Sequence, residues 1–514
     1  MPDYMFLLES RLSVEQRAAL LKLQELALTT ESNLYLSGGA VRDLISGMPI
    51  RDLDFVTEGN PARLAHEAEK SGARIVHEDE RLRTVDLEMA GDVETSLSAA
   101  RDEVYVRPGV KAEMRWSTVM EDLRRRDFSL NAIAISLNAA SRGLLLDPTN
   151  GLADLERREV RALSIHSFTN QPIRLLRVVR YAARMGFKIE QRTSEWMALA
   201  LERGLDKNID PEDAGQELRD VARDEKPAII LKAWEARGLL SAIHPLLAKK
   251  HPDYEALTRM NRVRDELFSA GLRPRLVVPT LYAVLGRLKD RERASLLSKL
   301  EFRAAAAQAV NDLESNADKF VKLLTSRKAA APIDAYAVLE KTPEDLLAFV
   351  LAESNNTKAI GKIKNYLHKW RALQQALPSA ETVLANLGMP RGPKFDKVMR
   401  EFFAQQLLGR ARKPEEHERV FRKLAGIKEP PKKKVEKEKR KKLAADLAKR
   451  TPSQKPPVAP EVPVKAPVAP APAPKAKPAS RPPAKAAAKP AAKKPAAKKK
   501  SAKKPAAKKK SGRR

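Results

Sequence analysis

The sequence predicts an α+β protein, in which a small mixed β-sheet with flanking helices is followed by all-α domains and a disordered basic tail. Short apolar runs with strand-like alternation, bounded by glycines and charged turns, occur between residues 34 and 96. Beyond residue 188 apolar residues recur at helical spacing and strand signals are absent. From residue 428 the composition changes to Lys, Pro and Ala. At 514 residues the chain is long enough for two or three domains with a substantial core.

Caps and periodicity predict the elements of the first part in order. Residues 13–29 have helical spacing with Ser13 in the N-cap position. A strand is expected at residues 34–37, and a helix follows the Gly38-Gly39 turn at once. Asn60 and Pro61 occupy cap and first-turn positions of a further helix. The remaining strands of the sheet are expected at residues 73–76, 83–89 and 93–96.

Residues 34–55, LYLSGGAVRDLISGMPIRDLDF, concentrate the candidate chemistry. Gly38-Gly39 allows a tight turn where any Cβ would obstruct a ligand. Backbone N–H groups at the start of the next helix, with Arg42 one turn in, can hold a triphosphate. Asp52 and Asp54 lie two apart, so on a strand they share a face and can bind the same divalent cations. A carboxylate pair beside a phosphate cradle predicts metal-assisted phosphoryl or nucleotidyl transfer.

Taken singly, a Gly-Gly turn is mostly only a turn, and a lone Asp-x-Asp is more often a solvated loop. Together, GG-x-V-RD followed by D-x-D resembles the signature of the DNA polymerase β-like nucleotidyltransferases. More narrowly, it resembles the tRNA nucleotidyltransferase and bacterial poly(A) polymerase group, the class II CCA-adding enzymes. The resemblance implies a nucleotidyltransferase head and a two-metal site, with Asp52 and Asp54 holding two Mg²⁺ ions that Mn²⁺ can replace. It further implies a head at 31–150, a neck at 151–250 and an RNA-binding body and tail at 251–427. Periodicity adds a helical segment at 1–30, and composition adds a basic tail at 428–514.

A second motif lies in residues 121–134, EDLRRRDFSLNAIA, where an apolar helix face is expected from Phe128 to Ala134. It matches the family's RRDF-x-x-NA pattern. The resemblance places Arg126 toward the triphosphate and Asp127 toward the ribose hydroxyls. A carboxylate can accept hydrogen bonds from a vicinal diol, although Asp127 as a simple N-cap explains the sequence equally well.

The helix predicted from Pro172 carries a stripe of four arginines, namely Arg174, Arg177, Arg180 and Arg184. Such a stripe is usually a solvated face, but the resemblance to the family's E-D-x-x-R helix favours contacts with the base and phosphates. Asn170 and Gln171 stand where related enzymes usually carry Glu-Asp. Gln171 keeps an acceptor, loses the charge and gains an NH₂ group that could face a carbonyl on U or G, unless Asp154 or another carboxylate takes over. We therefore expect relaxed base choice or restriction to one kind of addition, with Arg174 essential.

Glu94 is the weakest candidate. Related enzymes often have a further acidic residue on a strand that faces the metal site, which makes Glu94 a possible third metal ligand. A solvent-facing strand glutamate is at least as good an explanation, because Glu94 has no partner at a fixed spacing.

Composition constrains the location and the partners. The chain has no cysteine, which excludes disulfides and thiolate sites. Because it also has only seven histidines, a zinc site is improbable. Without a secretory segment or an apolar run near 20 residues, the sequence predicts a cytoplasmic protein that does not contact a membrane. Residues 428–514 contain 30 Lys and Arg against five Asp and Glu, which is +25 of the net charge of +31. We expect this tail to be disordered and to bind polyanions, although a solubility appendage or membrane-surface tether has the same composition.

The sequence therefore predicts an enzyme that adds nucleotides to an RNA 3′ end, with tRNA, ATP and CTP as partners and complete or partial CCA addition as the reaction. A poly(A) polymerase shares every motif, but the arginine-rich G-R-R-F-type segment usual there is absent from GARIVHEDERLRTVDL, residues 72–87. An RNA-binding protein on an inactive scaffold is the other alternative. The intact carboxylate pair argues against it, because carboxylates repel RNA.

Overall fold

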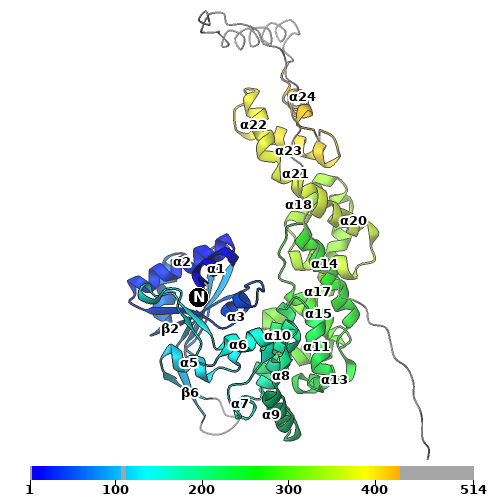
Figure 1. Cartoon of the computed structure of the whole chain (residues 1–514). Helices are drawn as coiled ribbons and strands as arrows, with labels where there is room; N and C mark the ends of the chain where they lie inside the picture. The colour runs from blue at the N-terminus through cyan, green and yellow to red at the C-terminus, as the bar shows by residue number, and fades with distance from the viewer. Residues whose placement is uncertain (1–2, 106–111, 412, 429–514) are drawn as a thin grey trace, which may run out of the picture. The chain divides into compact units, whose positions relative to one another are not determined.

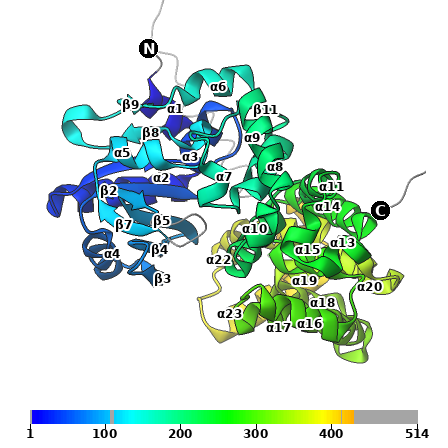
Figure 2. The ribbon, with the colours of Figure 1, turned by 90° about the horizontal axis from the view of Figure 1, so that it is seen from below.

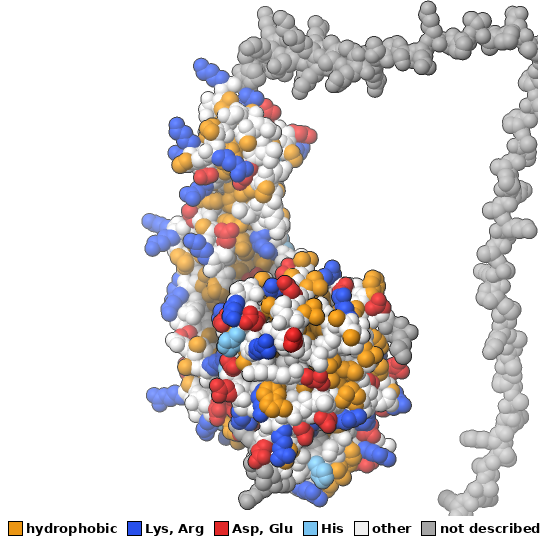
Figure 3. Space-filling model, turned by 90° about the vertical axis from the view of Figure 1, so that its left-hand side faces the viewer, with side chains coloured by type: hydrophobic (Ala, Val, Ile, Leu, Met, Phe, Trp, Pro, Cys, Tyr) orange, Lys and Arg blue, Asp and Glu red, His pale blue; other side chains and the backbone are white. Residues whose placement is uncertain are grey.

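The computed structural model describes residues 3–105, 112–411 and 413–428 (Figure 1; space-filling view in Figure 3). The predicted basic tail lies outside the described residues, apart from Lys428, so its predicted disorder is not tested. Among the described residues, no helix is long and apolar enough to cross a membrane. The compartment predicted from the sequence stays a prediction.

The head contains a seven-stranded mixed sheet in the order β3-β4-β5-β2-β1-β8-β9. Neighbouring strands are antiparallel except β2 and β5, which run parallel. The strands are β1 (Asn33–Ser37), β2 (Leu53–Glu58), β3 (Arg74–Asp79), β4 (Thr84–Met89), β5 (Val93–Ala99), β8 (Ala134–Ser136) and β9 (Leu145–Leu146). A separate antiparallel hairpin, β6 (Arg101–Val104) with β7 (Glu113–Trp116), was not predicted.

Side-chain alternation along β1 divides the head into two apolar layers. Leu34 and Leu36 belong to the large core beneath α2 (Val14–Thr29), α3 (Gly39–Ile45) and α4 (Pro61–Lys70). Tyr35 packs on the opposite face in a smaller cluster with residues of α5 (Val119–Arg125). The two layers explain why β1 is buried on both faces and reads as a continuous apolar run. The helices flank the sheet in Figure 2.

The predicted caps are confirmed. Ser13 forms a capping box with Gln16 at the start of α2, after the short α1 (Tyr4–Arg11). Asn60 accepts from the N–H of Ala62, and Pro61 is the first residue of α4. The predicted helix from Phe128 to Ala134 is wrong: a 3₁₀ turn, Ser129–Asn131, leads into β8. Pairing of Ala134–Ser136 with β1 outweighs the local helical pattern, because it completes the sheet.

The rest of the described chain is almost entirely helical, as predicted, apart from the two-stranded parallel pair β10 (Glu159–Val160) and β11 (Lys188–Ile189). The first helices are α6 (Gly151–Arg157), α7 (Ser167–Asn170), α8 (Arg174–Met185), α9 (Gln191–Glu202), α10 (Pro211–Arg223), α11 (Pro227–Glu235), α12 (Leu240–Ile243) and α13 (Pro245–Lys250). Next come α14 (Tyr254–Ser269), α15 (Val277–Leu285), α16 (Asp290–Lys299), α17 (Ala304–Thr325), α18 (Pro332–Glu340), α19 (Glu344–Glu353) and α20 (Thr357–Asn365). The last are α21 (Arg371–Gln375), α22 (Leu377–Asn386), α23 (Pro393–Leu407) and α24 (Pro414–Ala425).

The helical part is held by three apolar clusters. The core of the head continues through α8, α10 and α11 to α15. A second cluster joins α14 with α17 to α20, and a third holds α22, α23 and α24. Continuity of the first cluster fixes α8 and α10 against the head. The boundaries predicted at residues 30, 150 and 250 stay predictions.

Candidate active site

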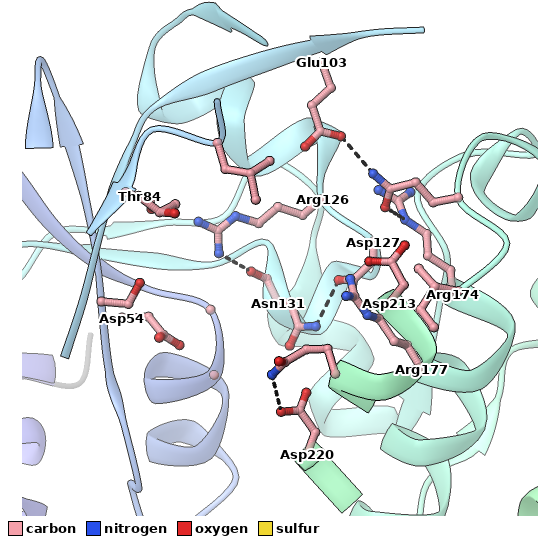
Figure 4. A pocket seen from close by; sticks show the side chains of 18 of the residues that line it. Asp54, Thr84, Glu103, Arg126, Asp127, Asn131, Arg174, Arg177, Asp213 and Asp220 are labelled. Atoms are coloured by element: carbon pink, nitrogen blue, oxygen red, sulfur yellow. Dashed lines mark hydrogen bonds and ion pairs between the residues drawn. The ribbon is translucent and has the colours of Figure 1, made fainter. Parts of the chain in front are cut away.

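A cavity of about 800 Å³ lies where the head meets α8 and α10 (Figure 4). Its wall comes from the turn before α3, the start of β2, the β6–β7 hairpin, the segment after α5, and the two helices. It contains every site residue predicted from the sequence except Glu94, namely Gly38, Gly39, Arg42, Asp52, Asp54, Arg126, Asp127, Gln171, Arg174, Arg177 and Arg180. Residues separated by more than 100 positions in the sequence therefore form one polar site.

The glycine turn brings backbone close to a carboxylate and a guanidinium. Gly38 has φ +65°, a left-handed conformation that glycine adopts at little cost. A Cβ at Gly38 would lie 3.0 Å from Arg126 Nη1, and a Cβ at Gly39 would lie 3.4 Å from Asp54 Oδ2. Both glycines therefore keep open the space between the turn, Arg126 and Asp54, as the sequence predicted.

Asp52 and Asp54 line the cavity at the start of β2, while Leu53 and Phe55 between and after them are buried in the core. The predicted alternation is thus confirmed. Burial and the charge of Asp52 raise the pKa of Asp54 to about 6, and burial also raises the pKa of Asp52. Each carboxylate disfavours ionisation of the other, so the pair is suited to a cation.

The carboxylate pair fits a hard divalent metal ion that completes its coordination with other oxygen atoms. Among the described residues, no cluster of three or more His, Cys, Asp or Glu side chains could hold a metal on its own. Mg²⁺ typically takes only one or two protein carboxylates and obtains its other ligands from water and substrate phosphates. Glu94 lies outside the cavity wall and forms a 2.6 Å ion pair with Arg275, although its charge contributes to the raised pKa of Asp52. Its role as a third metal ligand stays a prediction.

Arg126 is held rigidly at the edge of the phosphate space. It donates to Asp122 Oδ2 from Nε and Nη2, to the carbonyl of Asn131 from Nη1, and to Ser37 Oγ. Asp122 is 1% exposed and supplies its counter-charge. A guanidinium fixed in this way is preorganised to contact a phosphate oxygen.

Arg42 lines the cavity beside the glycine turn and is held by protein groups. Its side chain is buried, Nε donates to Asp43 at 2.8 Å, and Nη1 donates to Asn131 Oδ1 at 2.8 Å. The guanidinium also lies over the ring of Tyr181 on α8. Arg42 therefore joins α3 to the segment after α5, and its predicted role as a triphosphate ligand stays a prediction.

Asp127 lies between the 3₁₀ turn and α8. Oδ1 accepts from the N–H of Phe128 at 2.8 Å and from Asn131 Nδ2 at 3.0 Å, and Oδ2 lies 3.8 Å from Arg177 Nη1. Although burial opposes ionisation, Arg177 and Arg174 hold the pKa of Asp127 below its usual range. Asp127 is not a helix N-cap, because Phe128 occupies that position before the 3₁₀ turn. Its predicted role toward a ribose stays a prediction.

The arginine stripe of α8 is not a solvated face. Arg177 Nε and Arg180 Nε donate to the two oxygens of Glu217 at 2.6 and 2.8 Å, and Arg180 also reaches Asp220 at 3.2 Å. Arg184 pairs with Asp43 at 2.8 Å and so joins α8 to α3. Glu217 on α10 is completely buried and was missed, because nothing in the sequence indicates which distant acid neutralises the stripe.

The first turn of α8 forms the far end of the cavity. Arg174 Nε donates to Gln171 Oε1 at 2.9 Å, and the Gln171 amide donates to Glu103 on β6 (Figure 4). Asp154, considered as a replacement for the missing family carboxylate, is buried elsewhere against Ser129 and Arg161. Glu103 and Asn131 complete the site; Asn131 belongs to the second motif, whereas no pattern indicated Glu103.

Comparisons with known proteins find similar chains. Residues 34–161 match the family model described as the poly A polymerase head domain. The chain is similar to the A-adding tRNA nucleotidyltransferase of Halalkalibacterium halodurans, with 31% identity over 78% of this chain and 91% of the relative. It is 25% identical to the A-adding tRNA nucleotidyltransferase of Geobacter sulfurreducens over 77% of this chain, which spans 45% of that relative. A solved structure of a CCA-adding enzyme aligns with 83% of the chain at 24% identity and a TM-score of 0.45.

Proposed function

Because this chain belongs to the tRNA nucleotidyltransferase and poly(A) polymerase family, we propose that it adds nucleotides, and adenosine in particular, to the 3′ end of tRNA. The observation that carries the proposal is the Asp52–Asp54 pair beside the open Gly38-Gly39 turn and Arg126. The preference for adenosine rests on similarity to the Halalkalibacterium relative, an A-adding tRNA nucleotidyltransferase of which this chain spans 91%.

In the proposed reaction the 3′-hydroxyl oxygen of the RNA attacks the α-phosphorus of a nucleoside triphosphate. A new P–O bond forms, the bond to pyrophosphate breaks, and the hydroxyl proton passes to solvent. Asp52 and Asp54 would hold two Mg²⁺ ions, replaceable by Mn²⁺, which when bound neutralise phosphate charge and lower the pKa of the hydroxyl. The glycine turn admits the phosphates without steric conflict, and Arg126 contributes a fixed positive charge.

The remaining predicted residues are proposed to hold the nucleoside. Asp127 lies between the phosphate space and α8, where one carboxylate oxygen can accept from a ribose hydroxyl. Gln171 and Arg174 lie at the far end of the cavity, where the base would be placed. Arg177 and Arg180 are paired with Glu217 and so support the helix that carries Arg174.

The inactive-scaffold alternative is disfavoured by the energetics of the carboxylate pair. Desolvation of Asp54 and the charge of Asp52 disfavour the ionised form of Asp54, and carboxylates repel RNA, so a purely binding role gains nothing from the pair. A poly(A) polymerase remains the alternative activity.

The activity is tested by offering the protein tRNA transcripts that lack CCA, end in C or end in CC, together with unstructured RNA, in Mg²⁺ or Mn²⁺. Each nucleoside triphosphate is supplied singly and then together. One adenosine added to the transcript ending in CC supports the proposal. Long adenosine tracts on unstructured RNA would indicate a poly(A) polymerase, and no product with any RNA would support the scaffold alternative.

A further inference from the structure

A hydrogen-bonded chain inside the cavity joins a head carboxylate to Arg174. Glu103 Oε2 accepts from Gln171 Nε2 at 3.1 Å, and Gln171 Oε1 accepts from Arg174 Nε at 2.9 Å (Figure 4). The Tyr105 hydroxyl donates to Glu103 at 2.6 Å and accepts from the Gln171 amide. The chain crosses the back of the cavity from β6 to the first turn of α8.

The amide of Gln171 takes part in both contacts with one of its two hydrogens. Glu103 Oε2 and the Tyr105 hydroxyl oxygen lie 2.6 Å from each other, so both lie in nearly the same direction from Gln171 Nε2, and one N–H bond serves both acceptors. The other N–H bond points away from these two acceptors, so the expectation that the NH₂ group faces a carbonyl on U or G stays a prediction.

A carboxylate at position 171 would conflict with Glu103. The Glu103 side chain is only 6% exposed and is already fixed by a 2.6 Å ion pair with Arg125. Two buried carboxylates at hydrogen-bonding distance repel each other, and one of them must take up a proton. Glu103 therefore requires a donor at position 171, and an amide supplies one while its oxygen still accepts from Arg174.

We propose that Glu103 and Gln171 form a positioning pair that orients Arg174 and thereby determines nucleotide choice. This inference rests on the proposed function. Arg174 Nη1 donates to Ser167 Oγ at 2.9 Å and Nη2 donates to the Arg125 carbonyl at 3.3 Å. Each of these nitrogens carries a second hydrogen, so the guanidinium can donate to acceptors on a base edge. In this arrangement the negative charge is on Glu103. It therefore lies one hydrogen bond further from the base than the charge of a carboxylate at position 171 would.

An exchange of the two side chains tests the pair. The variants are Glu103→Gln, Gln171→Glu and the double variant, in the full-length protein. Each single change places two amides or two carboxylates together, whereas the double variant restores an amide-to-carboxylate hydrogen bond with its direction reversed. A matched control is the exposed pair on α9, where Gln191 donates to Glu195 at 3.1 Å. The changes Gln191→Glu and Glu195→Gln, singly and together, should leave nucleotide binding unchanged.

The readouts are the dissociation constants of CTP, ATP, UTP and GTP, and the KM and kcat of RNA extension. We expect each single variant to weaken binding of the preferred nucleotide about tenfold, with most of the effect in KM. The double variant should recover to within about threefold and favour CTP and ATP over UTP and GTP more strongly, because a charged acceptor beside the base favours exocyclic amines.

Single variants that bind all four nucleotides like the wild type, or a double variant as weak as both effects combined, would overturn the inference. The binding measurements separate it from the proposed function. If each single variant binds nucleotides more weakly and the double variant recovers, but the wild type extends no RNA, the positioning pair stands and the proposed activity fails.

Discussion

Replacement of Glu217 is the change that tests the architecture of the site most severely. This carboxylate is 0% exposed and accepts three hydrogen bonds, at 2.6, 2.8 and 3.3 Å, from Arg177 and Arg180. Its negative charge raises the pKa of both guanidinium groups, which opposes the effect of burial. Glu217→Gln keeps the shape, removes the charge and turns an NH₂ donor toward other donors.

Removing one partner of a buried ion pair costs roughly 3–5 kcal/mol when the remaining charge is left uncompensated. Here Asp220, 3.2 Å from Arg180, and Asp127, 3.8 Å from Arg177, compensate part of the charge, so the cost should lie toward the lower end of that range. Urea unfolding of Glu217→Gln should show a loss of that size, and the KM for nucleotides should rise because α8 carries Arg174. The matched control is Glu418→Gln, whose 2.8 Å ion pair with Arg422 lies at the surface and should contribute less than about 1 kcal/mol. A loss for Glu217→Gln no larger than that of the control would refute the reasoning.

Three further predictions concern other parts of the chain. Although burial opposes ionisation of Asp122, Arg126 and Arg125 hold its pKa below its usual range. The ionised Asp122 side chain therefore stabilises the folded protein above about pH 4, and this stabilisation is lost as the pH falls through the lowered pKa. Asp122→Asn should therefore flatten the decline of unfolding free energy between about pH 5 and 3, and an unchanged slope would exclude this contribution. Gly151→Ala places a Cβ 2.2 Å from the Ser129 carbonyl oxygen and should cost about 1–3 kcal/mol in thermal unfolding, whereas Gly361→Ala, in open space, should not destabilise. Removing residues 428–514 should flatten the salt dependence of RNA capture while kcat at saturating RNA stays unchanged; loss of turnover would show that the tail belongs to the active structure.

Local patterns, together with the family resemblance, were sufficient to predict the fold class and eleven of the residues that line the cavity. The alternation of Asp52, Leu53 and Asp54, the glycine turn, and the Ser13 and Asn60 caps are properties of neighbouring residues, and the structure reproduces them. Such features are encoded within a few residues, so they can be read without knowing what packs against them.

Side-chain partners over long sequence distances could not be predicted in this way. The stripe of α8 gave the correct arginines, but not their pairing with Glu217 some 40 positions away. Arg42 showed the same limitation, since its partner Asn131 lies 89 positions further along the chain. A helix was expected from Phe128 to Ala134, because the pairing of Ala134–Ser136 with β1 cannot be seen in the local pattern.

The central claim is that the Asp52–Asp54 pair supports transfer of a nucleotide to an RNA 3′-hydroxyl. Its most direct test is single-turnover extension of a tRNA transcript ending in CC, with radiolabelled ATP and Mg²⁺, by the wild type, Asp52→Asn and Asp54→Asn. Asp334→Asn, at an exposed position on α18, serves as the control. We predict one added adenosine with the wild type and the control, and at least about a thousandfold slower extension with either site variant, whose thermal unfolding shows an intact fold. Extension by both site variants at the wild-type rate would contradict the account.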